Sequence, residues 1–398
     1  MEELPSSSIP PFPELVASHT LPNPASSLAL SPDGSRVAVA GREMLRTVTL
    51  GGGGDGEMAE DLNLLSGNTR RLPQHAPLDV AWHPLQASVF ATGHAVNGAV
   101  VLWDTEQKGS DKLTRTLSGH SGAVNRLAFH PTEGTRLLSG SRDRSAKLWD
   151  TRQKSAKLSF AAAAEVRDVQ FSRQAPARFA AALENGVVQL FDVRVNREAL
   201  LSFHAHQKAV SCLDFHPERA GLLVTGSQDM LLRVWELEPG LFRDEKEGVT
   251  RRPSSGRGSL ADVPRSAHAV QTTAPVARVA WRPGADASAR LHVASCAHLP
   301  ALGAADAKLH VWDVLRPAIP LYSLAAHTDA LSAFAFLPPP LAAAGEALVT
   351  TGRDRQLLRH SLAHAPPPYE HVSPTAIAWA AAAARARCRN GFTISPRR

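Results

Sequence analysis

A recurring pair of residues constrains the fold of this chain more than any other feature of its sequence. Five times, an aromatic residue at the end of a predicted strand is followed directly by an acidic residue. The pairs are Trp103-Asp104, Trp149-Asp150, Phe191-Asp192, Trp235-Glu236 and Trp312-Asp313. The aromatic positions differ successively by 46, 42, 44 and 77, so the longest interval corresponds to one repeat plus an insertion. A period near 44 indicates an array of similar units.

A second marker has a constant spacing. An acid or amide stands six residues before each aromatic residue, at Asn97, Asp143, Asn185, Asp229 and Asp306, and the same offset links Asp354 to His360. Two repeats also place a His at one common offset before this Asp, with His120 before Asp143 and His206 before Asp229. Period and markers together are typical of WD repeats, which form four strands per blade. The sequence therefore predicts an all-β fold, a seven-bladed WD-repeat β-propeller.

The predicted propeller covers residues 12–365. Its blades centre on residues 27–50, 78–104, 122–150, 164–192, 208–236, 274–313 and 329–362. In each repeat, short runs of alternating apolar and polar residues predict three strands, and a fourth strand follows, as at residues 112–117. We expect residues 12–18 to supply the outer strand of the last blade. That pairing would close the ring and remove free sheet edges.

Four segments fall outside the blade pattern. Residues 1–11 are predicted to be a disordered N-terminus, and the Gly-rich residues 51–58 a loop. Residues 238–267 are polar and are predicted to be a disordered insertion. Residues 366–398 form an Ala/Arg-rich C-terminal tail. Short Ala runs elsewhere, such as residues 161–164, are interpreted as composition bias rather than helix, since this one leads straight into a strand pattern.

Composition narrows the possible functions. Lys and Arg exceed Asp and Glu, 43 against 37, a modest balance that favours acidic partners but is too dispersed to predict nucleic-acid binding. The three cysteines, Cys212, Cys296 and Cys388, are odd in number and far apart, so we expect neither a disulfide framework nor a Cys-based zinc site, and we expect a reducing compartment. The N-terminus lacks a signal-peptide pattern, and no run of apolar residues is long enough to span a membrane, so any membrane association is expected to be peripheral.

Two repeats carry the same four polar or aromatic side chains. They are His120, Ser139, Asp143 and Trp149, and His206, Thr225, Asp229 and Trp235. A hydrolase triad would occur once per site, whereas this set recurs, so we predict structural tetrads in which Asp accepts from His and the hydroxyl bridges His and the indole N–H. No P-loop, GxSxG or HExxH motif occurs. We therefore expect no catalytic, cofactor or metal site and no small-molecule substrate.

Two arginine pairs are candidates for partner binding. Arg142 and Arg144 flank Asp143, and Arg353 and Arg355 flank Asp354, in turns that we expect to open on the narrow face of the ring. Arg is favoured at protein interfaces, so these side chains could form a basic rim for an acidic partner. The alternative is dispersed, solvated charge.

Five stretches resemble a particular family more closely than the general WD pattern. They are GHSGAVNRLAFHPTEGTRLLSGSRD (119–143), EVRDVQFS (165–172), ENGVVQLFDVR (184–194), APVARVAWRP (274–283) and HVWDVLRPAIP (310–320). Over about residues 75–335 the chain resembles the WD-repeat protein twenty-four family. That resemblance implies a scaffold subunit of the SEA complex, called GATOR in animals, which controls TOR complex 1 and autophagy in response to amino acids. It also implies other subunits as partners, and a cytoplasmic location, peripheral at the vacuole or lysosome membrane.

The resemblance weakens towards the C-terminus. Members of that family continue into a helical region and a zinc-binding RING-like domain, whereas this sequence stops at Arg398. We expect the functions of that zinc domain to be missing here.

Two other functions stay open. One is a substrate receptor of a cullin–RING ubiquitin ligase, because residues 149–152 and 191–194 resemble the WDxR motif of such receptors. The other is a propeller hydrolase, which would need a single polar cluster in the central channel.

Overall fold

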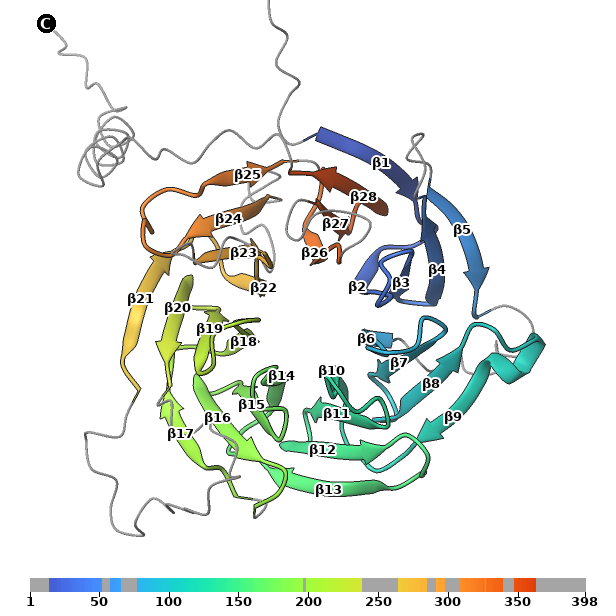
Figure 1. Ribbon diagram of the computed structural model, residues 1–398, viewed down its shortest axis with the longest axis horizontal. Coiled ribbons are helices and arrows are strands. Elements are labelled where there is room, and N and C mark those ends of the chain that lie inside the picture. The colour runs from blue at the N-terminus through green and yellow to red at the C-terminus, as the bar shows by residue number, and fades with distance from the viewer. Residues whose placement is uncertain are drawn as a thin grey trace, which may run out of the picture.

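Seven small sheets stand around a central axis (Figure 1). The computed structural model describes residues 14–51, 58–65, 77–195, 198–237, 264–284, 291–297, 308–325, 327–338 and 347–362. These residues form seven four-stranded antiparallel sheets, which confirms the predicted seven-bladed propeller. Neighbouring blades face one another across their sheets, and the innermost strand of each blade lines the channel.

The blades are numbered in chain order, with strands given from the axis outwards. Blade one is β2 (Ala25–Leu30), β3 (Arg36–Gly41), β4 (Met44–Leu50) and β5 (Met58–Asn63). Blade two is β6 (Pro77–Trp82), β7 (Val89–His94), β8 (Val100–Asp104) and β9 (Leu113–Leu117), with the 3-10 helix η2 (Gly109–Lys112) before β9. Blade three is β10 (Val124–Phe129), β11 (Arg136–Ser141), β12 (Ser145–Asp150) and β13 (Ala156–Ala161).

The remaining blades follow the same order. Blade four is β14 (Val166–Phe171), β15 (Arg178–Leu183), β16 (Val187–Asp192) and β17 (Leu201–His204). Blade five is β18 (Val210–Phe215), β19 (Leu222–Ser227), β20 (Leu231–Glu236) and β21 (Ser266–Gln271). Blade six is β22 (Val276–Trp281), β23 (His292–Ala297), β24 (Leu309–Asp313) and β25 (Tyr322–Leu324). Blade seven is β26 (Leu331–Phe336), β27 (Ala347–Gly352), β28 (Gln356–Ser361) and β1 (Glu14–Thr20).

Blade seven joins the two ends of the described chain. Strand β1 pairs antiparallel with β28, from Glu14 opposite Ser361 to Thr20 opposite Gln356. Residues 14–18 of the expected closing strand 12–18 lie in β1, which continues to Thr20. Residues 12 and 13 lie outside the described part of the chain. The first strand of the chain thus completes the last blade, as Figure 1 shows where β1 lies outside β28.

Two predicted loop boundaries are wrong. The expected insertion 238–267 includes Ser266 and Ala267, but these residues begin β21, because the SAHAVQ segment alternates exposed and less exposed residues and pairs with β20. Met58 was expected in a Gly-rich loop, yet it is buried and begins β5. Residues 1–11, residues 238–263 of the insertion, and residues 366–398 lie outside the described residues.

The hydrophobic core lies between the blades. One cluster joins Leu102 of blade two with Val124 and Trp149 of blade three, and another joins Phe160 of blade three with Phe179 and Phe191 of blade four. The Ala run 180–182 belongs to β15, in which all six side chains are buried. These sequences form strands because both faces of each sheet are covered by a neighbouring blade, so small and branched apolar residues fill narrow gaps.

Glycines in three second strands let the neighbouring blade approach closely. A Cβ atom built on Gly93, Gly140 or Gly226 would lie 2.8, 2.6 or 2.6 Å from a methyl group of the next blade's first valine. For Gly140 that valine is Val166, the first residue of β14. Contacts this short are far inside van der Waals distance, so the repeated Gly–Val pairing sets the spacing between blades.

We predict that Gly140→Ala destabilises the propeller, although alanine normally stabilises a strand relative to glycine by about 0.5–1 kcal/mol. The overpacking against Val166 should outweigh that gain and lower the free energy of unfolding by about 1–3 kcal/mol in urea titrations. Adding Val166→Ala makes room for the new methyl group, so the double variant should lose less than the sum of the two single losses. A Gly140→Ala protein as stable as the parent would contradict this account of blade spacing.

Candidate functional site

Four side chains of blade three form one hydrogen-bonded chain. The carboxylate of Asp143 can only accept, so His120 Nδ1–H donates to it, at 2.7 Å. The other ring nitrogen, Nε2, then accepts from the Ser139 hydroxyl, also at 2.7 Å, and Trp149 Nε1–H donates to the same hydroxyl oxygen at 2.8 Å. Every polar atom on this path has a partner, as burial requires.

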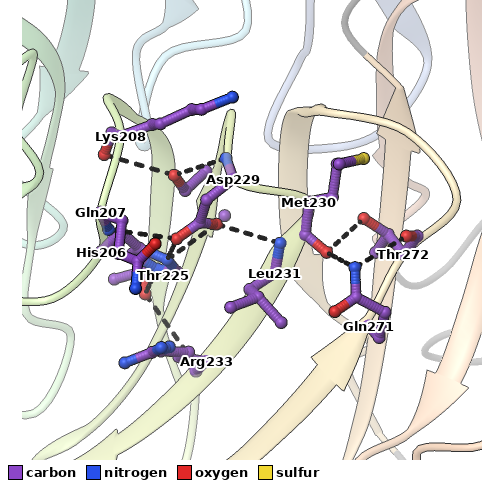
Figure 2. A network of polar contacts seen from close by, with 12 residues as sticks. His206, Gln207, Lys208, Thr225, Asp229, Met230, Leu231, Arg233, Gln271 and Thr272 are labelled. Atoms are coloured by element: carbon purple, nitrogen blue, oxygen red, sulfur yellow. Dashed lines mark hydrogen bonds and ion pairs between the residues drawn. The ribbon is translucent and has the colours of Figure 1, made fainter.

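Blade five repeats the arrangement with a threonine. His206 Nδ1 donates to Asp229 at 3.0 Å, Nε2 accepts from Thr225, and Trp235 donates to the Thr225 hydroxyl at 2.9 Å. Figure 2 shows that Asp229 also accepts from the backbone N–H groups of Gln207 and Leu231. The Asp therefore connects the loop that enters the blade with the turn between its second and third strands.

Blade seven holds a third set that the sequence revealed only through Asp354 and His360. His327 donates to Asp354 at 2.9 Å, Thr350 Oγ1 lies 2.8 Å from His327 Nε2, and His360 Nε2 lies 3.0 Å from the same hydroxyl. His360 takes the place of the Trp. Burial, with a smaller contribution from nearby His327, lowers the pKa of His360 to about 4, so His360 is neutral at pH 7. His327 stands 27 residues before Asp354, whereas His120 stands 23 residues before Asp143. The constant His–Asp spacing of the other two tetrads therefore does not reveal this set in the sequence.

Other blades keep only part of the set. In blade two, Trp103 donates to Thr92, which also contacts His94, and in blade six Trp312 donates to Ser295. Blade four carries Ala181 and Phe191 at the hydroxyl and Trp positions, both fully buried. Replacing both polar partners by apolar groups leaves no unpaired atom, so the blade remains intact without the network. Asp306 lies outside the described residues.

The buried sets are unsuited to hydrolysis. Ser139 and Trp149 are fully buried, and the Ser139 hydroxyl already donates to His120 and accepts from Trp149. Desolvation works to raise the pKa of Asp143, but hydrogen bonds from His120 and Ser145 outweigh it and leave that pKa well below its ordinary value. The carboxylate thus stays ionised as a fixed acceptor. A substrate could not reach the hydroxyl without breaking the blade.

The two arginine pairs lie on one face, formed by the turns between second and third strands and called here the second-turn face. Arg142, Arg144, Arg353 and Arg355 are all exposed. Arg144 and Arg355 adopt left-handed backbone angles, with φ of 62° and 63°, in turns where Asp143 and Asp354 accept from the N–H of Ser145 and Gln356. Blades three and seven are not neighbours, so the pairs lie on different sides of the channel (Figure 1).

A charged network crosses the channel, and sequence reasoning missed it. Asp79 Oδ1 accepts from the Ser27 hydroxyl at 2.7 Å and lies 3.2 Å from Arg126 Nη1 and 3.4 Å from Arg278 Nη2. Arg126 also contacts Asp168 at 2.9 Å through Nε. These residues occupy matching positions just after the register shift in the innermost strands of blades one, two, three, four and six.

Carboxylates also join neighbouring blades directly. Asp79 accepts from the N–H of Leu127, Asp168 from that of Leu213, and Asp214 from that of Trp281, at 2.9 to 3.0 Å. Each bond links one innermost strand to the next. Burial raises the pKa of both Asp168 and Asp214 to about 6, although Arg126 opposes the shift at Asp168 and Arg173 opposes it at Asp214. These aspartates lie in alternating strand patterns that looked like ordinary core, so only the ring geometry reveals their role.

The arginines of the two WDxR-like motifs contact the aspartates of their own motifs. Arg152 forms two hydrogen bonds to Asp150, at 2.9 and 2.7 Å, and Arg194 forms two to Asp192, at 3.1 and 2.8 Å. Paired contacts of this geometry fix the guanidinium in the turn. A partner that contacted Arg152 or Arg194 would find guanidinium groups that are already hydrogen-bonded to Asp150 or Asp192.

Metal-binding clusters and membrane-spanning helices are both absent from the part of the chain that the structure describes. There, no group of three or more His, Cys, Asp or Glu side chains could hold a metal ion. None of its helices has the length and apolar character needed to cross a membrane. Cys212 and Cys296 are buried as free thiols.

We predict that the tetrad of blade three stabilises the fold and does not contact partners. Trp149→Ala should lower the free energy of unfolding by about 3–5 kcal/mol, and Ser139→Ala by about 1–3 kcal/mol because the indole N–H loses its acceptor. The double variant Ser139→Ala, Trp149→Phe copies blade four and should lose less than the sum of its single variants. If Trp149→Ala left urea unfolding unchanged but abolished partner binding, Trp149 would instead be a contact residue.

Comparisons with known proteins agree with this geometry. The family model "WD domain, G-beta repeat" matches residues 111–150 and 197–236, the two stretches that hold the His-Ser/Thr-Asp-Trp sets of blades three and five. A chain from a structure named "Crystal Structure of Mitotic Checkpoint Complex" superposes with a TM-score of 0.65 at 19% identity, covering 91% of this chain and 95% of that chain. At that identity the match shows the shared fold alone.

Similarity to one group of proteins extends through nearly all blades. GATOR2 complex protein WDR24 of Homo sapiens is 33% identical over 357 residues, which cover 89% of this chain and 40% of that protein. The proteins of that name from Dictyostelium discoideum and Drosophila melanogaster are each 32% identical, over 90% and 86% of this chain and 32% and 39% of their own lengths. The chain thus spans two-fifths or less of these relatives. Identity sustained across the blades, on the fold that the sequence predicts, shows that this chain belongs to the WDR24 family.

Proposed function

We propose that this chain is a non-catalytic scaffold subunit of a GATOR2-type complex that acts in amino-acid signalling to TOR complex 1 and in the control of autophagy. One observation carries the proposal: 33% identity over 89% of the chain to a protein named as a GATOR2 complex protein. In this role the propeller holds other protein subunits and transforms no small molecule. Its place is the cytoplasmic side of the vacuole or lysosome membrane, which it reaches through the complex.

The use of the polar side chains supports a scaffold role. His120, Ser139 and Asp143 are committed to one another, as are His206, Thr225 and Asp229, and the sets are buried. Chemistry needs a reactive group that a substrate can reach. The channel carboxylates likewise bind backbone N–H groups and arginines of this chain. What remains accessible is the surface of the turns, which suits docking.

The second-turn face is the proposed docking surface for an acidic partner. Its four arginines, Arg142, Arg144, Arg353 and Arg355, are exposed, and within the described ranges their shortest ion pair is a weak one, 3.9 Å from Arg142 Nε to Glu165. Asp143 and Asp354 fix the backbone of the two turns, so the backbone has little entropy left to lose when a partner binds and the remaining cost is that of ordering the arginine side chains. Because the pairs flank the channel, a partner must span that face.

Affinity purification of the tagged chain from its own cells tests the subunit role. We expect the other subunits of a GATOR2-type complex to co-purify. Recovery of a cullin–RING ligase adaptor in their place would overturn the proposal and support the alternative that the WDxR-like turns suggest, with Arg152 and Arg194 as its contacts.

The docking surface has its own test. Changing Arg142, Arg144, Arg353 and Arg355 together to Glu should greatly reduce co-purification and remove its salt sensitivity, whereas each single change should matter little, about 0–1 kcal/mol. The matched control changes four exposed basic residues that lie away from the second-turn face, Lys108, Lys154, Lys157 and Arg219, to Glu. Circular dichroism checks folding of both variants. Full binding by a folded four-arginine variant would place the docking surface elsewhere.

A further inference from the structure

The channel mouth opposite the arginine pairs is hollowed. It lies on the face formed by the turns between first and second strands, called here the first-turn face. Two adjoining hollows of about 400 and 610 Å³ open there and share the side chains of Leu28, Arg126, Gln170 and Arg173. Together they form one bowl, whose floor is the charged network of the channel.

The wall of the bowl is aromatic and its rim is rich in proline. Each innermost strand ends near a bulky apolar residue and continues into a turn that often begins with proline. The aromatic residues of the wall are Trp82, Phe129, Phe171, Phe215, Trp281 and Phe336, of which Phe129 and Phe336 are partly exposed and the other four are buried. Pockets that combine apolar walls with a few convergent polar groups are typical of ligand sites.

The polar groups of the bowl present more donors than acceptors. Asp214 accepts from Gln170 Nε2 at 2.8 Å and from the Trp281 N–H at 2.9 Å, so both of its oxygens are engaged. Both oxygens of Asp79 are also occupied, one by the Leu127 N–H and the other by side chains. The carboxylates in the bowl thus have few lone pairs left to offer a ligand.

The arginines of the bowl have N–H donors that remain available to a ligand. A guanidinium has five N–H donors. Arg126 directs Nε and Nη1 to aspartates, and Arg278 reaches Asp79 only through Nη2, at 3.4 Å. The side chains of both remain about one-fifth exposed. Arg173, at the edge of both hollows, is exposed and makes neither a hydrogen bond nor an ion pair with any residue in the described ranges.

We propose that this bowl binds an acidic segment of a partner protein, with an Asp or Glu carboxylate over Arg173 and Arg278 and flanking residues against the aromatic wall. Guanidinium groups match carboxylates in geometry as well as charge. The partly exposed Phe129 and Phe336 and the prolines of the rim suit a peptide, because aromatic side chains bury large areas at interfaces. This site lies on the opposite face from the proposed docking surface and does not depend on the proposed subunit role.

Fluorescence anisotropy with the full chain and a fluorescein-labelled peptide of six glutamates tests the proposal. Peptides of six glutamines and six lysines serve as controls. Arg173→Glu should weaken glutamate-peptide binding at least tenfold, because the new carboxylate repels the ligand in the bowl. Lys154→Glu is the matched control: it makes the same charge change at an exposed site in the turn between β12 and β13, outside both proposed binding surfaces, and should alter binding less than twofold. Arg173 and Lys154 are both exposed, so both variants should melt like the parent.

Loss of glutamate-peptide binding in the Arg173→Glu variant alone supports the proposed peptide site in the bowl. Equal loss in both variants means that the peptide responds to overall charge, and overturns the proposal. Absence of binding at peptide concentrations of about 1 mM, or equal binding of the glutamine peptide, also overturns it. These results are independent of which subunits co-purify with the chain in cells, so failure here leaves the subunit role untouched.

Discussion

Every blade of this propeller depends on the closure of the ring by β1 and β28. A four-stranded blade is too small to be stable alone, because its two faces are covered only when a neighbour stands on each side. An open array would expose one face of blade one, one face of blade seven and the edge of β28. Pairing of Glu14–Thr20 with Gln356–Ser361 connects the first and last repeats and converts a row of marginal sheets into one cooperative unit.

Polar residues reinforce that closure from the inside. The tetrads of blades three, five and seven join loops to strands within a blade, while Asp79, Asp168 and Asp214 bind backbone N–H groups of the next blade. Arg278 reaches from blade six across the channel to Asp79 in blade two; the matching residue of blade seven between them is Ala333, whose small side chain leaves room. Such groups are costly to leave unpaired in a low-dielectric interior, so their mutual pairing favours a single arrangement of the ring.

The use of polar side chains inside the ring limits which groups remain available for function. The side chains that look chemically capable in the sequence are used to hold the structure, and the chemistry left at the surface is charge and shape. On the second-turn face the accessible groups include four arginines, of which Arg144 and Arg355 have left-handed backbone angles. On the first-turn face they include Arg173 at the edge of the bowl, with Arg126 and Arg278 partly exposed at its floor. The two proposed binding surfaces at opposite ends of one channel suit a subunit that contacts more than one neighbour.

Local repeats made the fold predictable. The six-residue offset between Asp143 and Trp149, and its copies, identified the blades, and the position of residues 12–18 just before blade one suggested the closing strand. Regular spacing also revealed the tetrads of blades three and five. Where spacing changes, prediction weakens. The set around His327 does not follow the common His–Asp spacing because its loop is longer, and the polar segment before β21 hides the start of that strand at Ser266. The channel network could not be predicted, because Ser27, Asp79 and Arg278 meet only when blades one, two and six are brought around a common axis.

The central claim is that the ring is closed by its first strand. The direct measurement compares urea unfolding of the full chain, of a variant lacking residues 1–13, and of a variant lacking residues 1–20. The account predicts that the first deletion unfolds much like the full chain, whereas the second, which removes β1, loses cooperativity and most of its stability. A synthetic peptide of residues 12–22 should restore part of that loss by pairing with β28. If the chain lacking residues 1–20 unfolded at the same urea concentration and with the same steepness as the full chain, the closed-ring account would be contradicted.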